Sequence, residues 1–213
     1  MTLTPEDTRL RLLSSGYIPV PCVGKAPAIR AWQALEPTAI EIGRWSHTAP
    51  AALNTGILTR TAPALDIDIL DPEAATAVEN LVRERFEERG LVLVRFGRAP
   101  KRAVLFHADA PFAKIKRVFG APGTPEGDCE KLEMLCDGQQ IVCFGAHPDT
   151  GKAYSWHGGE PGEVELLALP HIREDEARAL VDDAAALLVE KFGYRQTDEA
   201  SEAGQRRRRR AAG

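Results

Sequence analysis

The most constraining feature of the sequence is a short apolar run that contains two acids. Residues 63–69 are apolar except for Asp66 and Asp68, and a run of this length and composition predicts a buried β-strand. Side chains two residues apart in a strand project from the same face. The two carboxylates therefore share a face, where they repel each other and lose hydration. The chain must fold so that something on that face compensates both negative charges.

A divalent cation is the commonest compensation for such a pair, because hard oxygen ligands suit Mg²⁺ or Mn²⁺. A strand with one solvated face would also explain an isolated Asp-x-Asp. Glu133 favours the metal, because it is the single acid on its face of a second apolar run, residues 131–136. Two-metal sites need carboxylates from separate strands. We therefore expect Asp66, Asp68 and Glu133 to be the catalytic residues and the ligands of a two-metal Mg²⁺ or Mn²⁺ site.

Length and composition suit one globular domain, or one domain with two lobes. The chain has 213 residues, of which 44% are apolar and 27% charged. No uncharged apolar run approaches the ~18 residues of a membrane span, and the N-terminus lacks the apolar segment of a secretory signal. The four cysteines include no Cys-x-x-Cys pair. We expect reduced thiols, a cytoplasmic location and no membrane partner.

The net charge hides an uneven distribution. The total of −4 includes five consecutive arginines at residues 206–210, so the rest of the chain carries −9. Such an acidic body does not attract polyanions overall, and any nucleic-acid contact must come from local basic patches or metal ions. The arginine run itself can bind nucleic acid non-specifically or be a solvated tail.

Cap, turn and periodicity signals predict an α+β fold built from short elements. The predicted helices cover residues 5–15, 38–46, 72–89, 111–119 and 173–192. The predicted strands cover residues 17–23, 53–58, 63–69, 91–96, 102–107, 131–136 and 139–144. We expect the last two strands to form a hairpin around Asp137 and Gly138. The polar tail after the last helix is predicted to be disordered.

A basic loop between two predicted strands is the candidate phosphate contact. In residues 95–102, Gly and Pro set a rigid bend while Arg95, Arg98 and Lys101 offer charge-assisted donors. A solvated hairpin loop is the alternative. Lys25 in a V-G-K-A-P turn and His147 before a proline are further nucleotide-binding candidates, although turn chemistry or a structural hydrogen bond would also explain them. The strand entry at residues 54–56 could likewise approach a ligand.

Six segments in this order resemble the bifunctional DNA primase/polymerase N-terminal domain of the archaeo-eukaryotic primase superfamily. They are G-Y-I-P-V-P-C-V-G-K-A-P, L-N-T-G-I-L-T, L-D-I-D, L-E-M-L, G-A-H-P-D-T-G and Y-S-W, and the resemblance runs from residue 5 to about residue 172. It implies a two-lobed primase-polymerase fold with a central antiparallel RRM-like sheet. We expect a catalytic domain over residues 1–172, an amphipathic helix over 173–195 and an arginine-rich tail over 196–213.

The resemblance also implies an activity. Members of the family are nucleotidyltransferases that start or extend a strand from nucleoside triphosphates on a single-stranded DNA template. The family's metal-binding acids match Asp66, Asp68 and Glu133. Its usual Ser-x-His is replaced here by R-F-G-R-A-P-K, which resembles a variant of phage- and mobile-element-associated branches. The basic side chains of that segment would then contact the triphosphate.

We therefore expect a metal-dependent primase/polymerase that acts in the replication of a phage, plasmid or other mobile element, with a separate helicase as a further partner. Two alternatives remain open. The missing Ser-x-His is also compatible with a catalytically impaired accessory protein that binds nucleotides or DNA. Carboxylate pairs serve phosphodiester hydrolysis as well, so a metal-dependent nuclease is the third hypothesis.

Overall fold

Capping residues start the helices close to where the sequence predicts. The computed structural model describes residues 3–123 and 129–197. Thr4 and Thr38 each form a capping box with the residue three positions on, and the Asp71 carboxylate caps the third helix. The helices are α1 (Pro5–Ser14), α2 (Ala39–Thr48), α3 (Pro72–Phe86) and α4 (Glu174–Phe192), with 3₁₀ turns η1 (Trp32–Ala34), η2 (Glu87–Arg89) and η3 (Leu166–Ala168).

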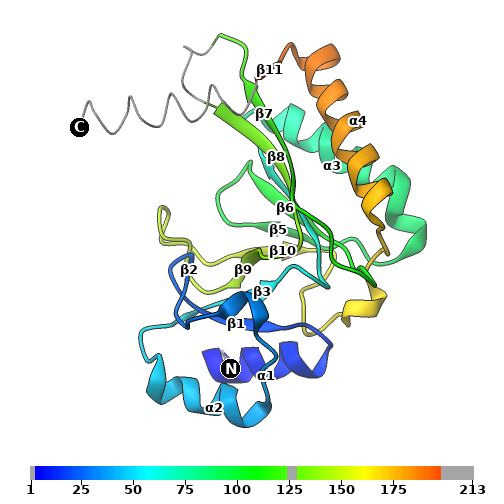
Figure 1. Cartoon of the computed structure of the whole chain (residues 1–213). Helices are drawn as coiled ribbons and strands as arrows, with labels where there is room; N and C mark the ends of the chain where they lie inside the picture. The colour runs from blue at the N-terminus through cyan, green and yellow to red at the C-terminus, as the bar shows by residue number, and fades with distance from the viewer. Residues whose placement is uncertain (1–2, 124–128, 198–213) are drawn as a thin grey trace.

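The strands form two antiparallel sheets, which confirms the α+β class (Figure 1). The small sheet has the order β2 (Ala26–Pro27), β1 (Pro19–Val23), β3 (Asn54–Leu58), β9 (Gln140–Phe144). The large sheet has the order β10 (Ser155–His157), β5 (Val94–Phe96), β6 (Arg102–Leu105), β4 (Ala64–Asp68), β8 (Cys129–Leu135), β7 (Ile115–Gly120), β11 (Arg195–Thr197). The predicted apolar strand with two acids is thus β4, at the centre of the larger sheet.

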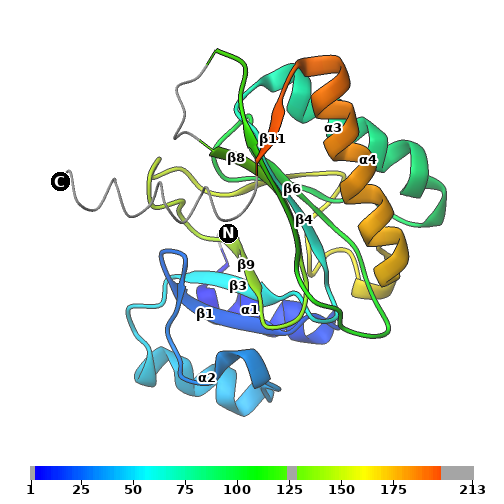
Figure 2. The ribbon, with the colours of Figure 1, turned by 45° about the horizontal axis from the view of Figure 1, so that its top comes forward.

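One face of the large sheet is covered by α3 and α4, as Figures 1 and 2 show. Leu65 and Ile67 of β4 project to this side and are fully buried in the largest apolar cluster. Because a strand alternates its faces, Asp66 and Asp68 project to the other side. The helix-covered face therefore holds the core and leaves the acids on the opposite face.

That opposite face is closed at one end by the small sheet. Ala64 of β4 pairs with Leu105 of β6, and both pack with Ile57 of β3 and Leu12 of α1 in a second apolar cluster. Figure 2 shows the small sheet, with α1 and α2, lying against this side of the molecule. The acids follow Ala64 along β4, so they lie where the two sheets diverge.

The predicted hairpin over residues 131–144 is wrong. Gly138 does adopt the left-handed conformation of a turn, with φ +66°, but β8 pairs with β4 and β7 while β9 pairs with β3. The turn carries the chain from the large sheet to the small one. Its sequence marks a reversal of the chain and does not specify which strands pair.

The predicted basic helix over residues 111–119 is also wrong, because Ile115–Gly120 forms β7. Ile115, Val118 and Phe119 are buried, and the strand pairs with β8 on one side and β11 on the other. Tertiary pairing overrides local propensity here. Residues 196 and 197, assigned to the disordered tail, end β11. The arginine run at residues 206–210, which was predicted to be part of a disordered tail, lies outside the described residues.

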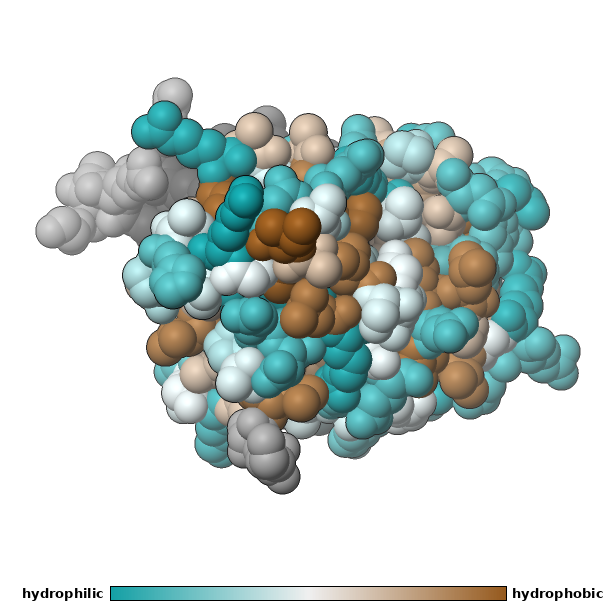
Figure 3. Space-filling model, turned by 90° about the horizontal axis from the view of Figure 1, so that it is seen from below, coloured by the Kyte–Doolittle hydropathy of each residue, from teal (hydrophilic) through white to brown (hydrophobic). Residues whose placement is uncertain are grey.

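The surface beneath α1 and α2 is mixed in character. Figure 3 views the molecule from this side and shows apolar patches separated by hydrophilic side chains. Among residues 3–123 and 129–197, every helix is too short or too polar to cross a bilayer.

Candidate active site

The register of the large sheet brings the three predicted acids onto one face. Asp66 of β4 lies directly opposite Glu133 of β8, and Asp68 lies opposite Lys131. Directly opposed residues in an antiparallel pair project from the same face. The side chains of Asp66 and Asp68 are 30% and 26% exposed, so both reach solvent. We call Asp66, Asp68 and Glu133 the acid cluster.

Burial and the neighbouring cations act in opposite directions on Asp66 of the acid cluster. Burial raises the pKa of Asp66, the nearby Arg95 guanidinium lowers it, and the charges of Asp68 and Glu133 raise it again, with a net increase. The Arg95 guanidinium stands 3.7 Å from the Asp66 carboxylate, and Lys101 forms an ion pair with Asp68. The pKa of Asp66 stays above its ordinary value because the effects of burial and of the two neighbouring acids exceed the effect of Arg95.

Glu133 has two lysine partners that sequence reasoning missed. Its carboxylate forms ion pairs with Lys131 Nζ at 2.7 Å and with Lys114 Nζ at 2.9 Å. Burial alone would raise the pKa of Glu133, but the hydrogen bonds from both ammonium groups outweigh burial and lower it. Lys131 could have been found, because it precedes Glu133 by two residues on one strand. Lys114 gave no such signal, because its segment reads as a helix.

A charged pocket joins the acid cluster to the predicted phosphate contacts. Its volume is about 120 Å³. Its lining residues come from both sheets and their loops: Lys25, Asp66, Asp68, Arg95, Gly97, Arg98, Lys101, Arg102, His147, Asp149 and Tyr154. All five residues predicted to bind a nucleotide therefore reach the same pocket as the two aspartates. Glu133 is outside this lining and joins it through its register with Asp66.

Arg95 connects the two sheets at the pocket. From β5 of the large sheet, its guanidinium donates to the Val142 carbonyl of β9 in the small sheet. It also lies 5.1 Å from the centre of the Tyr154 ring. Arg102, the last cation of the basic loop, is directed instead to Glu79 of α3. The loop thus sends Arg95 and Lys101 toward the acid cluster and Arg102 toward the helices.

His147 is buried beside the basic loop. Its Nδ1 accepts the Asp149 backbone N–H at 3.3 Å, and its ring meets that of Tyr154 edge-on, 5.6 Å between centres. Burial, followed by the charge of Lys25, lowers the pKa of His147, so the neutral ring carries its proton on Nε2. Gly97 permits this packing, because a Cβ there would lie 2.6 Å from Tyr154 Cε1.

Asn54 holds together two of the loops that line the pocket. Its Nδ2 donates to the carbonyls of Gly24 at 2.9 Å and Ala146 at 2.8 Å, and its Oδ1 accepts the Ala146 N–H at 3.0 Å. Gly145, with φ +104°, leaves no room for a side chain beside Asn54. The strand entry expected to approach a ligand therefore positions the neighbours of Lys25 and His147, and Asn54 itself is absent from the pocket lining.

Comparison with known proteins extends this picture. A family model described as "Bifunctional DNA primase/polymerase, N-terminal" matches residues 10–172. The match spans both sheets except β11, and includes the whole pocket and the acid cluster. A search of curated proteins found no match.

Proposed function

The chain belongs to the Prim-Pol family of bifunctional DNA primases/polymerases, and on that premise we propose that it is a metal-dependent nucleotidyltransferase. It would start or extend a DNA strand from nucleoside triphosphates on a single-stranded template. The observation that carries this proposal is the charged pocket, in which Asp66 and Asp68 face Lys25, Arg98 and Lys101. Phosphoryl transfer needs two kinds of side chain: acids that bind metal ions and basic residues that bind phosphate groups.

The acid cluster fits divalent metal ions. All of its donors are carboxylate oxygens, which Mg²⁺ and Mn²⁺ prefer. The raised pKa of Asp66 is compatible with this fit, because burial, and then the charges of Asp68 and Glu133, disfavour its ionised form until a further cation is bound. We propose Asp66, Asp68 and Glu133 as the ligands. The metal ion would displace Lys114 and Lys131 from the Glu133 carboxylate.

The size of the pocket supports binding of the triphosphate portion. About 120 Å³ accommodates phosphate groups and ions, whereas a site for a whole drug-sized ligand needs ~300–1,000 Å³. Arg98 and Lys25 are exposed at the pocket, so they are available to bind phosphate oxygens. The base and sugar would then lie outside the pocket, where a template strand can select the base by pairing.

Each residue then has a role in strand extension. Asp66, Asp68 and Glu133 would hold divalent cations, whose charge would activate the attacking 3′-hydroxyl and stabilise the departing pyrophosphate. Lys101 and Arg98 neutralise the charge that develops on the phosphates. His147 donates its Nε2 proton to a phosphate oxygen, since its Nδ1 is already engaged. Arg95 holds the Asp66 carboxylate in place.

The finer expectations from the sequence are part of the same proposal. The two sheets with their helices would correspond to the two lobes of a primase-polymerase fold, with the large sheet as the RRM-like element. The enzyme would serve the replication of a phage, plasmid or other mobile element, together with a separate helicase.

Two observations favour a second candidate, an accessory protein that binds nucleotides or DNA without catalysis. The two ion pairs on Glu133 compete with metal binding, and the Ser-x-His of the family is missing. A nuclease has less support, because the cations that line the pocket suit a triphosphate.

Incorporation of labelled nucleotides tests the proposal. The purified chain is incubated with Mn²⁺ or Mg²⁺, single-stranded template and either ribo- or deoxynucleoside triphosphates. We expect incorporation by the wild type and its loss in the double variant Asp66→Asn plus Asp68→Asn. The matched control is Asp182→Asn plus Asp183→Asn, two adjacent exposed acids on α4, which should retain wild-type activity.

The three hypotheses give different results. Triphosphate binding without any product, across both metals, would favour the accessory protein. Degradation of a labelled strand in the absence of triphosphates would favour the nuclease. Undiminished incorporation by the Asp66 and Asp68 double variant would refute the proposed active site.

A further inference from the structure

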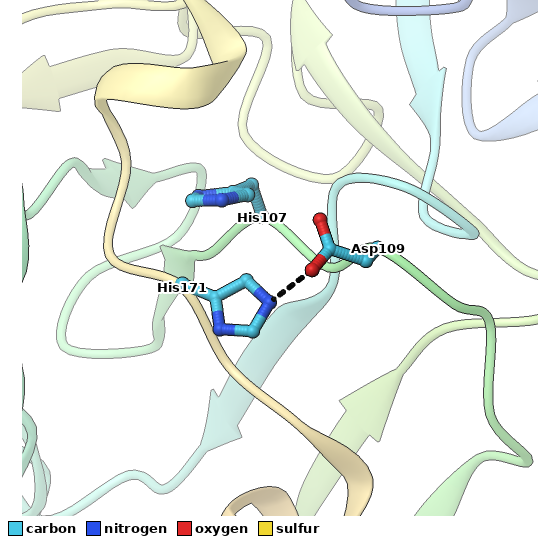
Figure 4. Close-up of side chains that lie close together, drawn as sticks. All are labelled: His107, Asp109 and His171. Carbon is cyan, nitrogen blue, oxygen red and sulfur yellow. Dashed lines mark hydrogen bonds and ion pairs between the residues drawn. The ribbon is translucent and has the colours of Figure 1, made fainter.

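Two histidines and an aspartate gather at the end of β6 away from the charged pocket. His107 follows β6, Asp109 lies two residues further on, and His171 lies just before α4 (Figure 4). One ligand atom of each lies within 4.8 Å of the other two. The two imidazole rings are 4.9 Å apart between centres, and His171 Nε2 lies 3.0 Å from Asp109 Oδ2.

The backbone holds the two histidines in place. His107 and His171 form a parallel bridge, in which the His107 N–H donates to the Pro170 carbonyl and the Ile172 N–H donates to the His107 carbonyl. These bonds connect segments more than sixty residues apart. The backbone positions of both histidines are therefore set by the fold.

A hydrogen bond fixes which nitrogen of His107 is available. Its Nδ1 lies 2.8 Å from the Leu169 carbonyl, an acceptor, so Nδ1 carries the proton. Nε2 of the neutral ring then has a free lone pair. Histidine ligands almost always have this arrangement, in which the second ring nitrogen donates to a carbonyl or carboxylate that orients the ring.

From this arrangement we propose that His107, Asp109 and His171 form a metal site separate from the acid cluster. Two imidazoles and one carboxylate suit a borderline ion such as Zn²⁺ and not Mg²⁺. Ligand atoms around a tetrahedral Zn²⁺ are ~3.4 Å apart, given bonds of about 2.1 Å. The His171–Asp109 pair already has nearly this spacing, and the Asp109 side chain, which is 83% exposed, is free to adjust.

The bound ion would connect the large sheet to its covering helix. His107 follows the end of β6, which pairs with β4 at the sheet centre, whereas His171 lies two residues before Arg173, the N-cap of α4. Three protein ligands leave a fourth position for water. Because the ion would bind only the folded chain, its binding would stabilise the protein.

Zinc titration of the full-length chain tests the proposal. After removal of metals with a chelator, we expect one equivalent of Zn²⁺ to bind to the Asp66→Asn plus Asp68→Asn variant, in which the acid cluster is disabled. Zn²⁺ at 100-fold excess over its dissociation constant should raise the midpoint of thermal unfolding by ~5–10 °C. Mg²⁺ should not produce this shift. Co²⁺ should give the visible absorption of a low-symmetry site.

Substitutions of the ligands complete the test. We expect His107→Gln and Asp109→Asn, made in the same double variant, to weaken Zn²⁺ binding by ~100-fold or more. Asp109 is too exposed for its substitution to unfold the chain. His47→Ala, at an exposed histidine of α2, is the matched control and should bind as before. Unchanged binding by the His107 and Asp109 variants, or no stoichiometric Zn²⁺ at all, would overturn the proposal.

Discussion

Strand β8 carries two glutamates that are equally buried, each 6% exposed, on opposite faces of the large sheet. Glu130 faces the helices, where its carboxylate accepts the Leu70 N–H at 2.8 Å and the Tyr194 hydroxyl at 3.0 Å. Glu133 faces the charged pocket side, where its carboxylate meets two ammonium groups and lies opposite Asp66.

The difference between these glutamates shows how one sheet separates stability from chemistry. The partners of Glu130 are a backbone amide and a phenol, which are fixed and cannot leave. The partners of Glu133 are long lysine side chains, one 24% and the other 34% exposed, which can exchange for another cation. We infer that Glu130 stabilises the fold and that Glu133 is available for binding. Four predictions test this contrast.

The largest expected effect is on activity, in Glu133→Gln. Loss of one carboxylate from the acid cluster should lower nucleotide incorporation by ~10²–10³-fold or more. The thermal unfolding midpoint should fall less than in Glu130→Ala, because Lys114 and Lys131 are 34% and 24% exposed and keep contact with water when their partner is lost. Single-turnover incorporation and calorimetry on the same sample measure both quantities. If Glu133→Gln unfolds at a much lower temperature and keeps its activity, Glu133 stabilises the fold and does not act in binding.

The second prediction concerns stability, in Glu130→Ala. The substitution removes the acceptor of the Leu70 N–H and the buried bond to the Tyr194 hydroxyl, so we expect a loss of about 1–3 kcal/mol in the free energy of unfolding. Urea denaturation measures it. Incorporation per folded molecule should match wild type well below the unfolding midpoint. Tyr194→Phe removes one of the bonds and should cost ~1 kcal/mol. Loss of activity in folded Glu130→Ala would show that the faces are not independent.

The sequence predicted the local features of this arrangement well. The caps of α1 and α3 and the alternation of β4 follow from residues near each other in the chain. The expectation that Glu133 joins Asp66 and Asp68 came instead from the chemistry of two-metal sites and from the family resemblance. The five nucleotide-binding candidates also reach one pocket. Whether these residues act in catalysis stays a prediction.

The sequence failed where distant segments decide the structure. Asp137 and Gly138 indicated a turn, but the partners of β8 and β9 depend on the whole sheet. Residues 115–120 form a strand because β8 and β11 pair with them, which no local pattern reveals. For the same reason the sequence could not indicate that Lys114 reaches Glu133, or that His107 and His171 meet.

The third prediction tests how the pocket side is positioned. Asn54→Ala removes the bonds to Gly24 and Ala146, so we expect a loss of about 1–3 kcal/mol in unfolding free energy. Because Lys25 and His147 lie beside these two residues, the KM for the triphosphate should rise more than kcat falls. Steady-state kinetics separate the two constants. Asn80→Ala, at an exposed asparagine of α3, is the control. A loss of stability with unchanged KM would remove Asn54 from the positioning of the pocket.

The smallest expected effect is a shift in pH dependence at Asp66. Its pKa is raised by burial and by the charges of Asp68 and Glu133, and lowered by Arg95. Metal ions bind the ionised carboxylate. The affinity for Mn²⁺ should therefore decrease as the pH is lowered, and the midpoint of this decrease should lie at a pH above the ordinary aspartate pKa of 3.8. Arg95→Gln should move that midpoint higher still. Titration of Mn²⁺ in the absence of triphosphate measures it, with Arg178→Gln, at an exposed arginine of α4, as the control.

The Asp66 carboxyl should affect folding in the opposite direction: lowering the pH weakens Mn²⁺ binding but increases the contribution of Asp66 to stability. The pKa of Asp66 is higher in the folded chain than in the unfolded one. Between these two pKa values the folded state binds more protons than the unfolded state. The contribution of Asp66 to stability therefore rises as the pH falls through that range. The difference in unfolding free energy between wild type and Asp66→Asn isolates this contribution from that of the other acids. On the helix-covered face, Glu130→Ala should leave the Mn²⁺ midpoint unchanged. A midpoint that moves with Glu130 as much as with Arg95 would mean that the charges of the two faces are coupled through the sheet.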